Sequence, residues 1–239
     1  MSKADLVTFD LDGTLIDTHS PVRLAMRLLK TDLMSKFVGV KLGIWALRYK
    51  AGRELDQSVP KAHIFRSLRS IPRSEADQIM RDLWNDTLVK YVRPEAVACI
   101  QAHVAAGRQV ILVSASFEPI LAEACRFVGA QGYIGVKMEV RDGYYTGNPA
   151  GEQTEGVQKL IQFLRYANRR YGNGDWRCSY AYGDHYSDEP ILAFADQAVC
   201  VNPDRRLEKI ASREGWSVVD WPVKEGRAAH RASFAAAAD

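Results

Sequence analysis

The chain has 239 residues, of which 47% are hydrophobic and 26% are charged, as in an ordinary soluble globular protein. Its formal net charge of only +3 gives no electrostatic reason to expect a nucleic-acid partner. The amino-terminal residues leave no room for a signal peptide, and no apolar run approaches the roughly 18 residues that span a bilayer. We therefore expect a cytoplasmic protein without a transmembrane segment, whose four scattered cysteines are free thiols.

The first predicted element is a short apolar strand that leads directly into the sequence Asp10-Leu11-Asp12-Gly13-Thr14. Two carboxylates at this spacing cost desolvation and repel each other unless a cation lies near them. The segment therefore predicts a strand whose carboxyl end presents a nucleophilic carboxylate and a metal site.

Residues 18–91 have helical periodicity and contain no convincing strand. Because they lie between the first and the second predicted strand, we expect a helical cap inserted over the catalytic edge of the sheet. The apolar run 37–47, with basic residues beside it, fits two interpretations. It is either a cap helix packed against its neighbours or a contact with lipid phosphates at a membrane surface.

From residue 92 onward, predicted strands and helices alternate, which favours an α/β fold with a Rossmann-like, three-layer parallel sheet. A hairpin is expected within 136–145, around Arg141-Asp142-Gly143. We expect a core of residues 1–17 and 92–223, a cap of residues 18–91 and a flexible tail of residues 224–239. The predicted helices are 94–106, 118–128, 155–171, 190–195 and 204–214, and the predicted strands are 109–113, 179–182, 198–201 and 217–220.

Polar residues also follow two later strands of the predicted sheet. Ser114-Ala115-Ser116 follows the second strand, and Gly183-Asp184 follows a later one, with Asp188 one turn further on. Each segment alone fits a helix cap or a tight turn. Together, and each after a strand, they predict a shared site at the carboxyl edge of the sheet.

This combination of motifs resembles the haloacid dehalogenase superfamily of phosphohydrolases over residues 5 to about 221. The first motif is Asp10-Leu11-Asp12-Gly13-Thr14, the second is Ser114, and the fourth is Gly183-Asp184 with Asp188. A helical cap between the first and second motifs is similar to subfamily IB, the phosphoserine-phosphatase-like branch.

The resemblance implies a mechanism and a cofactor. Asp10 would attack phosphorus and form a phosphoaspartate, while Asp12 would protonate the leaving group and then activate water. Mg²⁺ would bind the Asp10 and Asp184 carboxylates and the Asp12 main-chain carbonyl, with Asp188 orienting this shell. Ser114 and the neighbouring backbone at Ala115 would bind the phosphoryl oxygens.

Two positions depart from the family pattern. Ser187 stands where the family often has asparagine, and Gly156 falls where the branch's Glu-Lys-Val pattern puts its lysine. Lys159 lies three residues later on nearly the same helical face, so we expect it to supply the cation. Lys137 is a more distant substitute.

Three further residues have a functional and a structural interpretation. His19 and Arg23 follow the first motif, where Arg23 either contacts the substrate's leaving group from the cap or is a solvated helix residue. His185, directly after Asp184, either faces the substrate or belongs to a surface loop.

We therefore expect a Mg²⁺-dependent phosphomonoesterase acting on a small phosphorylated metabolite or a phospholipid head group. The alternatives are a phosphotransferase or phosphomutase of the same superfamily and a weakly active regulatory or binding homologue. The sequence makes no prediction of oligomeric state, and peripheral contact with a membrane stays open.

Overall fold

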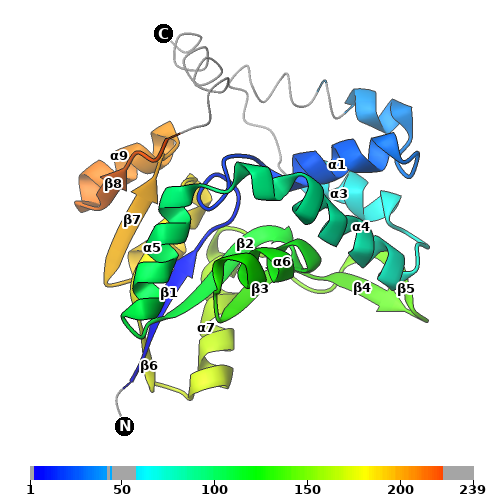
Figure 1. Cartoon of the computed structure of the whole chain (residues 1–239). Helices are drawn as coiled ribbons and strands as arrows, with labels where there is room; N and C mark the ends of the chain where they lie inside the picture. Colours follow the sequence, from blue (N-terminus) through cyan, green and yellow to red (C-terminus); the bar gives the residue numbers. More distant parts are fainter. Residues whose placement is uncertain (1–2, 42–43, 45–57, 223–239) are drawn as a thin grey trace.

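The centre of the molecule is a six-stranded parallel sheet with the strand order β3-β2-β1-β6-β7-β8 (Figure 1). It is seen in a computed structural model that describes residues 3–41, 44 and 58–222. The sheet strands are β1 (Ala4–Phe9), β2 (Gln109–Phe117), β3 (Gly132–Val136), β6 (Trp176–Gly183), β7 (Gln197–Val201) and β8 (Ser217–Val219).

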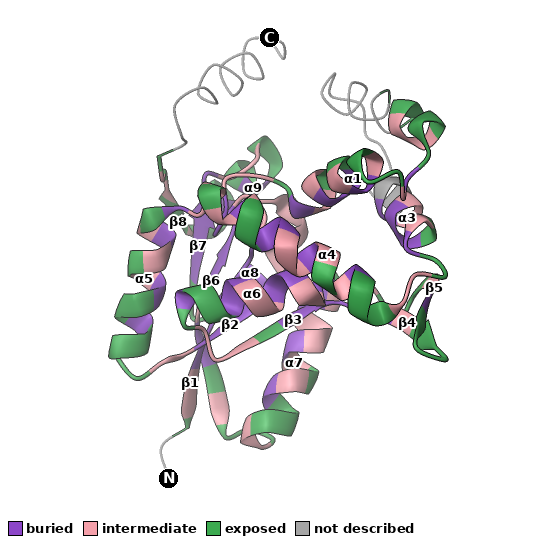
Figure 2. Cartoon of the chain, turned by 45° about the vertical axis from the view of Figure 1, so that its right-hand side comes forward, coloured by how far each residue is buried: buried purple, intermediate pink, exposed green. Residues whose placement is uncertain are grey.

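Helices cover both faces of this sheet, which confirms the predicted three-layer α/β fold (Figure 2). Successive strand residues point to opposite faces. In β1, Val7 and Phe9 pack with the helices of one face, and Leu6 packs with Phe163 on the other. The first face carries α5 (Pro94–Ala105) and α6 (Glu118–Val128), and the second carries α7 (Val157–Tyr171), α8 (Glu189–Phe194) and α9 (Arg205–Glu214).

The insertion, residues 18–91, leaves and re-enters the sheet at two neighbouring points. Ile16 and Val92 form an antiparallel bridge, and the Asp17 amide donates to the Tyr91 carbonyl oxygen over 2.8 Å. The described part of the insertion is helical, with no strand longer than a single bridge. Its elements are α1 (Ser20–Lys30), the helical residues 36–41, α3 (Ser58–Ser67), α4 (Arg73–Asp86) and the 3-10 helix η1 (Leu88–Tyr91).

A two-stranded hairpin, β4 (Met138–Arg141) and β5 (Tyr144–Pro149), follows β3 and lies beside the insertion (Figure 1). The prediction of a hairpin around Arg141-Asp142-Gly143 is confirmed. Asp142 and Gly143 have φ of 52° and 83°, the left-handed pair that a tight hairpin turn requires. Backbone hydrogen bonds join β5 to the loop before α4, so the hairpin and the insertion form one wall.

The structure differs from the predicted elements in two places. β2 continues to Phe117, so Ser114 and Ser116 lie within the strand rather than after it, because Phe117 still pairs with Val136. β3 was not predicted as a separate strand. The predicted tail and most of the apolar run after residue 41 lie outside the described residues. No helix in the described ranges is long and apolar enough to cross a membrane.

Candidate active site

Asp10 lies at the carboxyl end of β1, in the middle of the sheet. Its amide donates to the Tyr182 carbonyl oxygen of β6 over 3.0 Å. One residue earlier, the rings of Phe9 and Tyr182 stack with centroids 4.0 Å apart. These contacts fix the two strand ends side by side, and the Asp10 side chain is buried at the edge where open parallel sheets bind ligands.

Asp184 follows β6 and meets Asp10 at this edge. One carboxylate oxygen each of Asp10, Asp184 and Asp188 lies within 4.8 Å of the other two. Gly13 makes room for this approach, because a Cβ there would lie 2.0 Å from Asp184 Oδ2, and its φ of +85° favours glycine. Thr14 Oγ1 donates to Asp184 Oδ1 over 3.2 Å. The glycine and threonine of the first motif thus position the acid that follows β6.

Lys159 lies between two of these carboxylates. Its Nζ is 2.8 Å from Asp10 Oδ1 and 2.5 Å from Asp188 Oδ1, and only 4% of its side chain is exposed. The chain turns into α7 at Gly156, whose φ is +55°, so that the first turn of this helix faces the strand ends. Gly183 lets Asp188 approach, because a Cβ there would lie 2.7 Å from Asp188 Oδ2. We call Asp10, Asp184, Asp188 and Lys159 the carboxylate cluster.

The charges of the carboxylate cluster do not balance, because two buried carboxylates and the half-buried Asp184 lie near one ammonium group. Burial raises the pKa of Asp10 to about 7, even though Lys159 favours its ionised form. Burial and the charges of Asp10 and Asp188 raise the pKa of Asp184 well above its usual value. Burial alone would lower the pKa of Lys159, but the neighbouring carboxylates raise it, so this lysine stays charged.

The donor set of the cluster fits a divalent metal ion. Carboxylate oxygens are the ligands that hard cations such as Mg²⁺ prefer. An ion among Asp10, Asp184 and Asp188 would neutralise the two negative charges that Lys159 leaves unbalanced. The absence of a side chain at Gly13 keeps Asp184 close to the other acids. These three residues could therefore hold the metal.

Asp12 accepts two hydrogen bonds from Ser20, at the start of the insertion. The Ser20 amide donates to Asp12 Oδ1 over 2.6 Å, and Ser20 Oγ donates to Oδ2 over 2.8 Å. Because that hydroxyl proton goes to Asp12, Ser20 Oγ accepts from Ser116 Oγ, 2.7 Å away. Burial raises the pKa of Asp12, while the Ser20 donors oppose the rise. Asp12 is half-buried, and its raised pKa favours the protonated form.

Ser114 lies in β2 at the same edge of the sheet. It stands two residues beyond Leu112, which pairs with Phe9 of β1. Its buried Oγ accepts from the Ser116 amide over 3.2 Å. Ala115, between the two serines, is half-buried. The second motif thus contributes one serine to the strand edge and another to the Asp12 network.

Two of the candidate residues lie in other surroundings. Arg23 Nε donates to Thr18 Oγ1 over 3.1 Å, and the guanidinium lies 4.7 Å from the centroid of the Tyr91 ring. It therefore joins the two ends of the insertion. Lys137 lies 3.7 Å from Glu118 in a separate cavity, so it does not replace Lys159 beside Asp10.

His185 and Lys61 each contact an acidic side chain away from the carboxylate cluster. The His185 ring is half-buried, with Nδ1 3.0 Å from Ser187 Oγ and Nε2 3.5 Å from Asp204. It therefore orders the turn that holds Asp188 instead of extending from a surface loop. Lys61 of α3 is buried and donates to Glu155, just before α7, over 2.6 Å. This ion pair joins the insertion to the core.

Sequence reasoning missed the network around Asp12. Ser20 and Ser116 are 96 positions apart, and only the folded chain brings their hydroxyls together. A local signal was present for Ser20, because Pro21 directly after it is typical of the first turn of a helix. The Lys61–Glu155 pair has no such signal.

Several known proteins are similar to this chain in sequence. A family model described as haloacid dehalogenase-like hydrolase matches residues 7–193. A histidinol-phosphatase of Neisseria meningitidis is 30% identical over 91% of this chain and 99% of its own length. The phosphoserine phosphatase SerB1 of Mycobacterium tuberculosis is 29% identical over 90% of this chain and 70% of its own length.

Solved structures share the fold. A Bordetella pertussis protein of unknown function has a TM-score of 0.80 and 27% identity, over 92% of this chain and 99% of its own. A phosphoserine phosphatase solved as a phospho-aspartyl intermediate analogue has a TM-score of 0.61 and 16% identity, over 93% of this chain and 95% of its own. The latter likeness concerns the fold alone.

The chain belongs to the haloacid dehalogenase-like hydrolases. Its relatives include two proteins that are named as phosphatases, and the chain is a phosphoric monoester hydrolase.

Proposed function

We propose that the protein is a Mg²⁺-dependent phosphomonoesterase that hydrolyses a small phosphorylated metabolite through a phosphoaspartate on Asp10. The observation that carries this proposal is the position of Lys159, 2.8 Å from Asp10 and 2.5 Å from Asp188. A buried cation beside the nucleophile neutralises charge that would otherwise repel a phosphate ester.

In the first step, a carboxylate oxygen of Asp10 attacks phosphorus in line with the leaving alcohol. The bond between phosphorus and the alcohol oxygen breaks, and Asp12 donates a proton to that oxygen. The raised pKa of Asp12 supports this acid role, because it favours a bound proton at the start of the reaction. Lys159 donates a hydrogen bond to Asp10 Oδ1 and so holds the nucleophilic carboxylate in place.

In the second step, water attacks phosphorus and releases inorganic phosphate from Asp10. The Asp12 carboxylate now accepts a proton from that water, which returns both residues to their starting states. Ser114 and the Ala115 amide are proposed to bind the phosphoryl oxygens during both steps. A Mg²⁺ ion held by Asp10, Asp184 and Asp188, with the Asp12 carbonyl, would stabilise negative charge on the phosphoryl group.

The relatives suggest the substrate class. Histidinol-phosphatase and phosphoserine phosphatase are named for phosphate esters of small alcohols. We propose a substrate of this size, with phospholipid head groups such as phosphatidylglycerophosphate as the second candidate. A panel of both classes, assayed for released phosphate, separates the two.

The test of the reaction is hydrolysis of p-nitrophenyl phosphate by the wild type and by Asp10→Asn, with Mg²⁺ and after its removal by a chelator. We expect Mg²⁺-dependent release of phosphate by the wild type only. A silent wild type would support the regulatory homologue, and an equally fast Asp10→Asn variant would exclude the phosphoaspartate. Phosphate that moves within a substrate without release would indicate the phosphomutase instead.

A further inference from the structure

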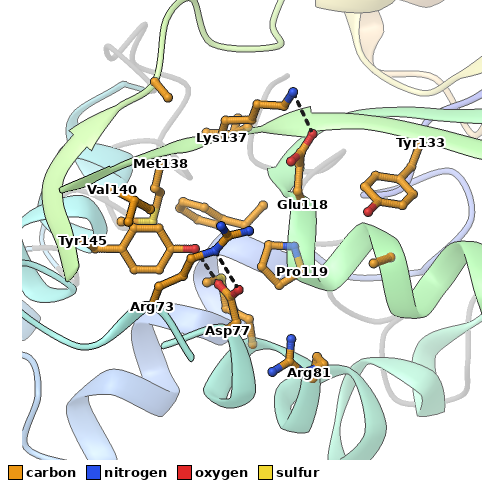
Figure 3. A pocket seen from close by; sticks show the side chains of 15 residues that line it. Arg73, Asp77, Arg81, Glu118, Pro119, Tyr133, Lys137, Met138, Val140 and Tyr145 are labelled. Carbon is orange, nitrogen blue, oxygen red and sulfur yellow. Dashed lines mark hydrogen bonds and ion pairs between the residues drawn. The ribbon is translucent and has the colours of Figure 1, made fainter. Parts of the chain in front are cut away.

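A second cavity, of about 460 Å³, lies between the insertion and the core (Figure 3). Ligand sites in proteins are typically about 300–1,000 Å³ in volume. α4 and the β4–β5 hairpin form one wall, and the first turn of α6 with the end of β3 forms the other. None of the residues of the carboxylate cluster lines it. We call it the α4 cavity.

The wall on the side of the insertion is held by a compact set of contacts. Backbone hydrogen bonds join Tyr145 to Ser70 over 2.8 Å and to Ile71 over 3.1 Å. The Tyr145 hydroxyl donates to Asp77, and Arg73 Nε donates to the other oxygen of the same carboxylate over 3.3 Å. Figure 3 shows these three side chains meeting at one side of the cavity. The Asp77 charge is therefore already engaged.

The wall on the core side begins one residue beyond the Asp12 network. Ser116 Oγ bonds Ser20, whereas Phe117, the next residue of β2, lines the α4 cavity. Consecutive strand residues point in opposite directions, which explains why a single peptide unit separates the two sites. Phe117, Met80 and Tyr145 give the cavity an apolar floor.

The charges that line the cavity have a cationic surplus. Arg73, Arg81 and Lys137 face two acids, Asp77 and Glu118. Lys137 Nζ forms an ion pair with Glu118 over 3.7 Å, and the lysine side chain is exposed (Figure 3). Both Nε and Nη2 of Arg81 donate to the side-chain oxygen of Gln78, a neutral amide, over 3.2 Å. Arg81 thus brings a positive charge that these bonds do not neutralise.

We propose that the α4 cavity is a second binding site, which takes a small organic anion with an aromatic or branched apolar body. The apolar part would rest on Phe117, Met80 and Tyr145, and the anionic group would bind Arg81 with Lys137 at the rim. Because the ligand contacts both the insertion and the core, it would hold one against the other. The site is separate from the carboxylate cluster and does not depend on the proposed reaction.

The test uses 8-anilinonaphthalene-1-sulfonate, an aromatic sulfonate, and N-phenyl-1-naphthylamine, which has the same body without the charge. Binding to the full chain is followed by fluorescence and calorimetry. We expect saturable binding of the sulfonate at one site, and weaker binding of the neutral compound. Binding of the sulfonate should be the same in Asp10→Asn as in the wild type.

Two variants assign that binding to the cavity. Ala122→Trp fills it from α6, and Arg81→Gln removes the surplus charge without changing the apolar floor. We expect each variant to weaken sulfonate binding about tenfold. Arg81→Gln removes a hydrogen bond to a charged group. Ala122→Trp takes up the space that the aromatic part of the ligand would occupy. Arg81→Gln should leave binding of the neutral compound unchanged. Thermal unfolding checks that both variants are folded.

Matched controls are Ala102→Trp on α5 and Arg126→Gln on α6, both at exposed positions outside the cavity. They should bind the sulfonate like the wild type. The proposal is overturned if Arg81→Gln, which changes a half-buried side chain and is expected to fold, binds the sulfonate like the wild type. It is also overturned if a folded Ala122→Trp binds normally, or if the wild type shows no saturable site.

Discussion

The carboxylate cluster and the α4 cavity are both lined by charged side chains, but they balance charge in opposite ways. In the cluster, one ammonium group lies between two buried carboxylates, and the half-buried carboxylate of Asp184 lies beside them. In the cavity, three cations face two acids around open space of about 460 Å³. Carboxylates that are buried beside other carboxylates have raised pKa values and offer ligands to a metal ion, whereas charges around an open space can bind a ligand from solvent.

The largest expected effect comes from Asp12, which should act in the cluster's reaction and have no influence on the cavity. Asp12→Asn keeps the shape but cannot transfer the proton, so we expect steady-state hydrolysis to fall about 10²–10⁴-fold. With p-nitrophenyl phosphate, whose leaving group needs little protonation, one burst of p-nitrophenol should precede the slow phase. Rapid-mixing absorbance measures this. Wild-type turnover in Asp12→Asn would rule out the proton transfer, and Asp196→Asn, which changes an exposed acid, is the control.

The next effect tests the one cation of the cluster. Lys159→Gln leaves Asp10 and Asp188 without their buried partner, and we expect hydrolysis to fall about 10²–10³-fold, as when one charge-stabilising donor is lost. Lys209→Gln, at an exposed position of α9, serves as the matched control. The rate of hydrolysis of each variant is measured by steady-state kinetics at saturating Mg²⁺. Equal activity in Lys159→Gln and Lys209→Gln would contradict the role of this lysine.

How much of this site could be predicted depended on how far the signals lie apart in the chain. Asp10 and Asp184 each follow a buried strand, so a parallel sheet places them at one edge, and they meet there. Lys159 could be predicted to lie near that edge from its helical face. The hydrogen bond between Ser20 and Ser116 could not, because it depends on how the insertion packs on β2.

The α4 cavity was beyond sequence reasoning for a related reason. Its walls come from α4, the hairpin, β3 and α6, which are far apart in the sequence and meet only in the folded chain. The hairpin turn itself was predictable from Asp142-Gly143. Where β5 would dock was not, because the backbone bonds from Tyr145 to Ser70 and Ile71 have no side-chain signature.

Removing the metal should expose the charge imbalance as a pH effect on stability. In the folded chain Asp10 keeps its proton up to a pKa of about 7, whereas the unfolded chain releases it near 3.8. The free energy of unfolding of the metal-free protein should therefore fall as pH rises from about 4 to about 7, by up to ~1.4 kcal/mol per pH unit for this group. Denaturant titrations with chelator measure this.

Two comparisons check the cause of that slope. Asp10→Asn has no proton to lose, so its slope should be smaller than that of the wild type. Mg²⁺ should raise the melting temperature of the wild type more at pH 8 than at pH 5.5, because protons compete with the metal for the carboxylates. A melting temperature that does not respond to Mg²⁺ at either pH would contradict a metal site in the cluster.

The smallest expected effect tests whether the carboxylate cluster with its Asp12 network is independent of the α4 cavity. Ser20→Ala removes the hydroxyl between Asp12 and Ser116 but keeps the Ser20 amide bond to Asp12. We expect hydrolysis to fall tenfold or less and the free energy of unfolding to drop by about 1 kcal/mol. Sulfonate binding in the α4 cavity should not change. Its loss in Ser20→Ala would mean that the two regions are not separate.

The measurement that tests the proposed chemistry most directly is the capture of a phosphoryl group on the protein. The wild type is mixed with Mg²⁺ and substrate, quenched in acid within one turnover and digested, and the peptides are analysed by mass spectrometry. We predict one phosphoryl group on the peptide that contains Asp10, absent from the Asp10→Asn variant. Phosphate release by the wild type with no phosphoryl group on Asp10, or with the group on another residue, would contradict nucleophilic attack by Asp10.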